Sequence, residues 1–169
     1  VMGAQGGGSL LAGNIGLVVN YYSEQSRSNS HMVAEAALQA IKEVCTRLQR
    51  VQVVKVLPVV LQTLVACVQD HSWPVRDAAV GALGALVVAF SKEITDLEAG
   101  GLEYGDSQGQ TDDADGGDDE RKETSGAGAV AVLVGACCTQ LTDTIPSVRE
   151  TAAVALANIC MMRGNNDVH

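Results

Sequence analysis

One stretch of this sequence occurs twice, and the repetition restricts the fold more than any other feature. Residues 70–87 have the sequence DHSWPVRDAAVGALGALV, and residues 143–160 have the sequence DTIPSVRETAAVALANIC. Aligning the two stretches places Asp70 on Asp143, Val75 on Val148, Arg76 on Arg149, Asp77 on Glu150 and Leu83 on Leu156. A turn, a Val-Arg-acid triplet and an Ala-rich amphipathic segment therefore recur in register, which predicts a repeat protein.

A weaker copy precedes these two. It aligns Val33 with Val75, Glu35 with Asp77 and Ile41 with Leu83, but it has Ser28 and Ala34 where the second copy has Asp70 and Arg76. We therefore predict three helix pairs, over residues 9–49 (a degenerate copy), 51–92 and 127–163. A Gly-rich lead-in at residues 1–8 and a tail at residues 164–169 flank them, and glycine at position 164 is expected to end the last helix.

The first helix of the second copy has apolar residues at one-face spacing, namely Leu57, Leu61, Leu64 and Val68. Pro58 stands near its start. Because an interior proline removes a hydrogen bond and clashes with the preceding turn, Pro58 is expected either to begin the regular helix or to bend it.

The charge of the chain is concentrated in one segment. The formal net charge is −9, and between Asp96 and Glu123 there are eleven acidic and two basic residues. The rest of the chain is neutral, which argues against nucleic-acid binding, since a basic surface is needed to contact phosphates. Residues 93–126 lack helical periodicity and are rich in glycine, so we predict a disordered acidic insert there.

Five cysteines are scattered through apolar segments, without a CxxC pair. This usage is typical of a reducing compartment and predicts an intracellular protein, cytoplasmic or nuclear. No apolar run is long and uninterrupted enough to span a membrane, so no membrane span is expected. The chain begins with Val1 and is interpreted as a piece of a longer protein, whose neighbouring repeats would stack on it.

The residues of the second copy resemble the HEAT repeat, an antiparallel helix pair of the armadillo type. The likeness covers most of residues 51–90, residues 130–162 well, and residues 10–48 only by register. It implies an all-α, right-handed α-solenoid of about three HEAT-like helix pairs. HEAT families use an aspartate and an arginine to join neighbouring turns, so the resemblance assigns Asp70, Arg76, Asp143 and Arg149 to a structural ladder. A contact between these arginines and a ligand or phosphate is the alternative.

No combination of residues indicates catalysis, a cofactor or a metal site. His31, His71 and His169 each lack a second ligand at helical spacing. We expect a non-catalytic scaffold that binds other proteins, of unidentified kind, along its second helices. By register, the residues that face outward there are Glu35, Gln39, Lys42, Asp77 and Glu150, beside small residues such as Gly84. Trp73 is either a partner contact or a cover for the ladder.

A transport receptor is the alternative function. In receptors of the importin-β type, an acidic loop within a HEAT array contacts basic cargo or a GTPase. The acidic insert at residues 93–126 is the feature that suggests it.

Overall fold

The computed structural model describes residues 13–100 and 128–166, with side chains for 13–97 and 128–163. Within these residues every regular element is an α-helix. The helices are α2 (Ile15–Gln25), α3 (His31–Arg47), α4 (Arg50–Val53), α5 (Leu57–Cys67), α6 (Trp73–Ala89), α7 (Ser91–Gly100), α8 (Ala129–Gln140) and α9 (Pro146–Asn166). The prediction of an all-α fold is confirmed.

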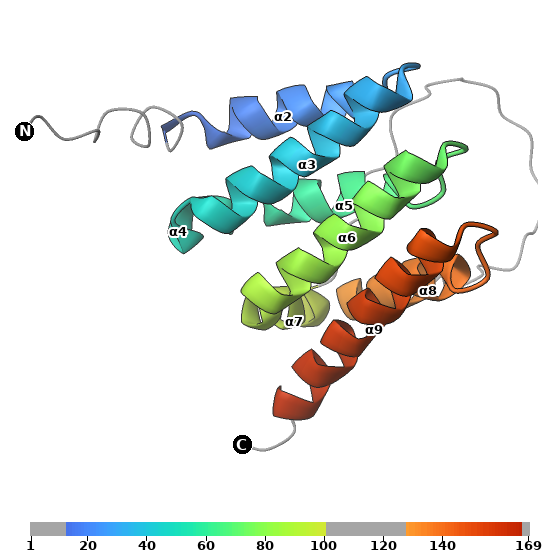
Figure 1. Cartoon of the computed structure of the whole chain (residues 1–169). Coiled ribbons are helices and arrows are strands. Elements are labelled where there is room, and N and C mark those ends of the chain that lie inside the picture. The colour runs from blue at the N-terminus through green and yellow to red at the C-terminus, as the bar shows by residue number, and fades with distance from the viewer. Residues whose placement is uncertain (1–12, 101–127, 167–169) are drawn as a thin grey trace, which may run out of the picture.

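The long helices form three antiparallel pairs, which we call the first unit (α2 and α3), the second unit (α5 and α6) and the third unit (α8 and α9). The second helices α3, α6 and α9 lie side by side in one layer, and the first helices form the other layer (Figure 1). Helix α6 contacts both α3 and α9, while α5 contacts both α2 and α8. This stacking of helix pairs is the predicted α-solenoid.

A single hydrophobic core runs through all three units. Its largest fully buried side chains include Leu38 in the first unit, Leu61 and Leu83 in the second, and Leu133 and Ile159 in the third. Because each pair leaves one apolar face uncovered until a neighbour packs on it, the stability of each unit comes largely from the next one.

The short helices α4 and α7 hold equivalent places. Each follows the second helix of one unit and precedes the first helix of the next. Both therefore lie on the side of the array where the second helices end (Figure 1). Each also buries one apolar side chain completely, Val53 in α4 and Ile94 in α7. Helix α7 packs against α8 as well as α6, and we therefore count it as the first element of the third unit.

The predicted boundary of the acidic insert is wrong at its beginning. Residues 93–100 belong to α7, because Ile94 and Leu97 are one helical turn apart and pack on the core, while Asp96 between them is exposed. The insert therefore interrupts the third unit between α7 and α8. The rest of it lies outside the described residues, as does the predicted lead-in at 1–8.

The predicted end of the last helix is also wrong. Helix α9 continues through Gly164 to Asn166, although Gly164 was expected to stop it. Glycine inside a helix costs only about 1 kcal/mol relative to alanine, and it does not end a helix without a left-handed cap. Residues 167–169 of the predicted tail lie outside the described part of the chain.

Three helices begin at or next to a proline. Pro58 lies in the first turn of α5, so it begins this helix rather than bending it. Pro74 stands in the first turn of α6, and Pro146 begins α9. A proline is tolerated there because the first amides of a helix have no partner within the helix.

No single helix among those described is both long and apolar enough to cross a membrane. Helix α6 and the first part of α7 together satisfy such a criterion by length and composition, but they meet at a bend of 97°.

Candidate protein-interaction surface

Arg76 of the second unit and Asp143 of the third are brought together at the turns between first and second helices. Nε of Arg76 donates to Oδ2 of Asp143 at 2.7 Å, and Nη2 donates to Oδ1 at 3.0 Å. The third nitrogen, Nη1, donates to the backbone carbonyls of Asp70 and His71. Arg76 thus fastens its own turn and the next turn with one planar group.

This ion pair is shielded from solvent. The side chain of Arg76 is 15% exposed and that of Asp143 is 5% exposed. The hydrogen bonds from Arg76 lower the pKa of the Asp143 carboxyl below its usual value, aided by the backbone N–H of Ile145. The carboxylate is therefore charged at neutral pH and fully engaged in holding two units together.

Arg149 repeats half of this arrangement. Its Nη1 donates to the backbone carbonyls of Asp143 and Thr144, at 2.7 and 3.2 Å. Its side chain is exposed, and no carboxylate among the described residues pairs with it. Of the four residues assigned to the ladder, Arg76 and Asp143 thus form a rung between units. Asp70 and Arg149 contact only their own turns.

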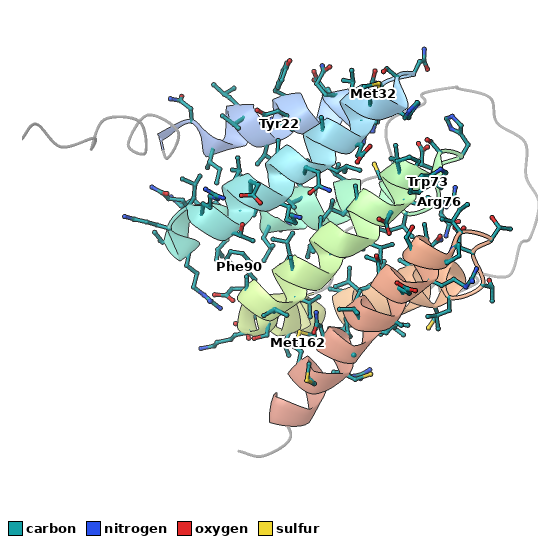
Figure 2. All side chains as sticks on the ribbon, viewed as in Figure 1. Tyr22, Met32, Trp73, Arg76, Phe90 and Met162 are labelled. Carbon is teal, nitrogen blue, oxygen red and sulfur yellow. The ribbon has the colours of Figure 1, made fainter. Side chains whose placement is uncertain are left out.

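The second helices present an exposed surface on the outside of their layer. Of the residues predicted to bind a partner there, Gln39 and Glu150 are exposed, while Glu35, Lys42 and Asp77 are half-buried. Trp73 is 47% exposed at the beginning of α6 (Figure 2). Asp77 accepts a hydrogen bond from Thr151 of α9 at 2.8 Å, so part of its carboxylate already joins two units.

Gly84 does not lie on the outward surface, contrary to the prediction. It is buried under α9, where a Cβ atom on Gly84 would lie 3.2 Å from Cβ of Ala155. The exposed surface contains Val154 at 62% exposure, a position expected by register to face outward, and two large apolar side chains that the sequence did not predict there, Val88 at 65% and Met161 at 60% exposure. Their positions follow the register of the repeat, since Met161 holds in α9 the place of Val88 in α6.

The second and third units each match a known repeat family. The family model for the HEAT repeat matches residues 60–90 and 133–161, which lie within the second and third units. The chain contains HEAT repeats. HEAT repeats generally serve as protein-interaction scaffolds, and they are typically non-catalytic. No curated protein matches the chain at a significant level.

The first unit departs from the HEAT pattern where it meets the second. Ala34 stands in place of the ladder arginine and is 1% exposed, so an apolar contact replaces the ion pair. On the other layer, Oγ1 of Thr63 in α5 donates to Oγ of Ser23 in α2 at 3.0 Å. This buried hydroxyl contact joins the first HEAT-like unit to the second.

A second ion pair joins neighbouring units on the other side of the array from the Arg76–Asp143 pair, where the second helices end. Two nitrogens of Arg50, at the start of α4, donate to the two carboxylate oxygens of Glu93 in α7. A third nitrogen donates to the carbonyl of Ala89 at 2.9 Å, and the guanidinium lies 5.4 Å from the ring centre of Phe90. The hydrogen bonds from Arg50 lower the pKa of Glu93.

This tie was not predicted from the sequence. Arg50 lies between two predicted repeats and Glu93 at the start of the predicted insert, and neither residue belongs to the repeated phrase.

The described HEAT units hold no group of three or more histidine, cysteine or acidic side chains suited to a metal ion. Burial raises the pKa of the Cys45 and Cys137 thiols to about 11, and it also raises the pKa of Cys67. A thiol must be deprotonated to act as a nucleophile, so these three are chemically quiet at neutral pH.

Proposed function

We propose that this chain is a non-catalytic scaffold that binds another protein across the outer surface of α6 and α9, as part of a larger HEAT-repeat protein. The observation that carries this proposal is the exposure of four large apolar side chains on two neighbouring helices. We call Trp73, Val88, Val154 and Met161 the second-helix patch. Exposed apolar side chains gathered on one surface are typical of interaction sites, and tryptophan is favoured at their centres.

The polar residues of the same layer favour a protein partner of mixed character. Helix α3 contributes Gln39, Lys42 and the half-buried Glu35 to the same layer, and α9 contributes the exposed Glu150. A polar border around an apolar centre is the usual composition of a reversible protein interface. An amphipathic helix, lying across α6 and α9, is the partner that such a surface fits best.

A charge placed in the patch tests this function. The double variant Val88→Asp and Met161→Asp adds two carboxylates at exposed positions, so the fold should survive, while an apolar partner surface would be excluded. The matched control is Val59→Asp, which alters a residue with 42% exposure on α5 in the other layer. Helicity and melting temperature of each variant are compared with the original before binding is measured.

Binding is measured by capturing proteins from a cell extract on the immobilised original chain and on each variant. We expect a set of proteins retained by the original chain and by Val59→Asp to be lost on the double variant. The same set on all three chains would show that the second-helix patch does not bind them, and would overturn the proposal.

No structural observation favours the transport-receptor alternative, because the acidic residues on which it depends after α7 lie outside the described part of the chain. An intracellular location, cytoplasmic or nuclear, stays a prediction from the sequence.

A further inference from the structure

A groove of about 420 Å³ lies between α2 and α3, and we call it the tyrosine groove. Its walls are Tyr21, Tyr22 and Gln25 of α2 and, on α3, Met32, Val33 and three alanines. Tyr22 and Met32 lie at the opposite end of the array from α9 (Figure 2). Met32 is 71% exposed and Tyr21 is 57% exposed, so this apolar edge has no cover within the described part of the chain. Exposed apolar surface of this kind marks a place where another segment or chain binds.

The chemistry of the tyrosine groove selects an uncharged apolar side chain. The rings of Tyr21 and Tyr22 meet edge to face, with their centres 5.4 Å apart, and Tyr22 also packs against the hydrophobic core. None of the side chains that line the groove is charged, so a charge buried there would find no counter-ion. The flexible thioether of methionine fills irregular gaps and makes favourable contacts with aromatic rings, so methionine suits this groove well.

The chain contains a segment with this chemistry, joined directly to one wall of the groove. Residues 1–12, with the sequence VMGAQGGGSLLA, precede α2 and carry no charge. The other two stretches outside the described residues do not fit. Residues 101–127 contain nine acidic and two basic residues, and residues 167–169 follow α9 at the far end of the array (Figure 1). Residues 1–12 are therefore the part of this chain whose chemistry and attachment match the tyrosine groove.

The length of this segment is sufficient for it to reach the groove. Three consecutive glycines, Gly6, Gly7 and Gly8, allow the chain to reverse its direction, because glycine adopts turn conformations that other residues avoid. Counted at the helical rise of roughly 1.5 Å per residue, Tyr21 lies about 20 Å from Gly8. The six residues from Met2 to Gly7 span about 20 Å when extended. A reversal at the glycines therefore brings Met2 to the level of Tyr21.

We propose that residues 1–8 fold back along α2 and that the side chain of Met2 occupies the tyrosine groove. The segment then acts as a cap on the first unit, because it covers apolar surface that would otherwise be open to a second chain. A covered outer face on the terminal unit is what keeps a stack of helix pairs from associating through its ends. The inference concerns a different surface from the second-helix patch, so either one can fail while the other holds.

Disulfide trapping in the whole chain tests this cap. The exposed cysteines are first replaced, with Cys138→Ser and Cys160→Ser, and Ala4→Cys is then combined with Ala40→Cys in the groove. Ala4 is two residues from Met2, so the docking side chain is kept. The matched control pairs Ala4→Cys with Val59→Cys, because Val59 is 42% exposed and is the register equivalent in α5 of Leu17 in α2. Under mild oxidation we expect the groove pair to cross-link within one chain about tenfold faster than the control pair, since docking raises the effective concentration of the two thiols.

A charge at Met2 shows whether the cross-link depends on docking. Met2→Asp should remove the advantage of the groove pair, whereas Ser9→Asp, which adds the same charge beyond the glycines, should leave it unchanged. Circular dichroism of each variant checks that the helices are intact. Equal rates for the groove and control pairs, or a groove pair that Met2→Asp does not slow, would overturn the proposal. A cross-linked product of twice the mass would show that a second copy supplies the segment, and it would overturn the proposal as well.

Discussion

The guanidinium of Arg76 donates to both carboxylate oxygens of Asp143, which belongs to the following unit. Both side chains are largely removed from water, and Arg76 also holds two carbonyls of its own turn. The pair therefore links the position of one turn to the position of the next. Removing one partner leaves the other charged, buried and without its counter-ion. This loss lowers the free energy of unfolding far more than loss of an ion pair on the surface would.

Arg76→Ala should lower the free energy of unfolding by about 3 kcal/mol, because Asp143 then loses two hydrogen bonds in a shielded site. Arg149→Ala is the matched control. It removes a similar contact to two turn carbonyls, but from an exposed side chain, and should cost about 1 kcal/mol or less. Urea unfolding followed by circular dichroism measures both. Equal losses for the two variants would contradict the role of the buried pair.

Acid should weaken the junction between the second and third units. Arg76 makes the pKa of Asp143 lower in the folded chain than in the unfolded chain, and Arg50 does the same for Glu93. The unfolded state therefore binds more protons on acidification. This stabilisation is complete above the unfolded carboxyl pKa, about 4, and is lost as the pH falls through the folded value.

The destabilisation by Arg76→Ala should accordingly be largest near neutral pH and shrink as the pH falls below about 4. Urea unfolding at a series of pH values measures this difference. A difference that stays constant down to the acid limit of folding would show that the carboxylate of Asp143 is not its source.

The tie between Arg50 and Glu93 should hold α7 to the array more than it stabilises the whole chain. Arg50 is 54% exposed, so Glu93→Gln should cost only about 1 kcal/mol in global unfolding. The amides of α7 should nevertheless exchange with solvent faster in this variant, since its link to α4 is weakened. Hydrogen exchange measured by mass spectrometry over α7 and, as a control, α3 distinguishes the local effect from a general one.

Two helical glycines should respond to substitution in opposite ways. Gly135 of α8 has open space where a Cβ would lie, so Gly135→Ala should stabilise the chain by about 0.5–1 kcal/mol. A larger side chain at Gly84 would instead press on Ala155, so Gly84→Val should destabilise it by about 1–3 kcal/mol. Thermal and urea unfolding of both variants checks the prediction, and a neutral Gly84→Val would contradict the close packing of α6 on α9.

The cysteines should separate into two classes by reactivity. Cys138 and Cys160 are exposed, whereas Cys45, Cys67 and Cys137 are buried and have raised pKa values. With a thiol reagent at neutral pH we expect two cysteines to react quickly and the other three only on unfolding. Fast modification of all five in the folded chain would contradict the core described for the array.

The repeated phrase predicted the helix pairs and the residues at their turns, because equivalent positions in stacked units have equivalent neighbours. It did not predict the contact between Arg50 and Glu93. These residues lie outside the phrase, and their meeting depends on how α4 and α7 pack. Gly84 was placed outward because residues three and four apart share one face of a helix. Only the packing of α9 shows that Gly84 is buried, whereas Ala85, the next residue, is partly exposed.

The insert divides the third unit after α7, and both α7 and α8 are held in place by contacts with other helices of the array. Helix α7 is fastened by Glu93 and by the buried Ile94, while α8 is packed against α5 and α9. The covalent link between Gly100 and Ala129 is consequently dispensable for placing either flank. A chain cut there by a protease should persist as two associated fragments. A reporter domain inserted at the same place should leave α7 and α8 packed as they are.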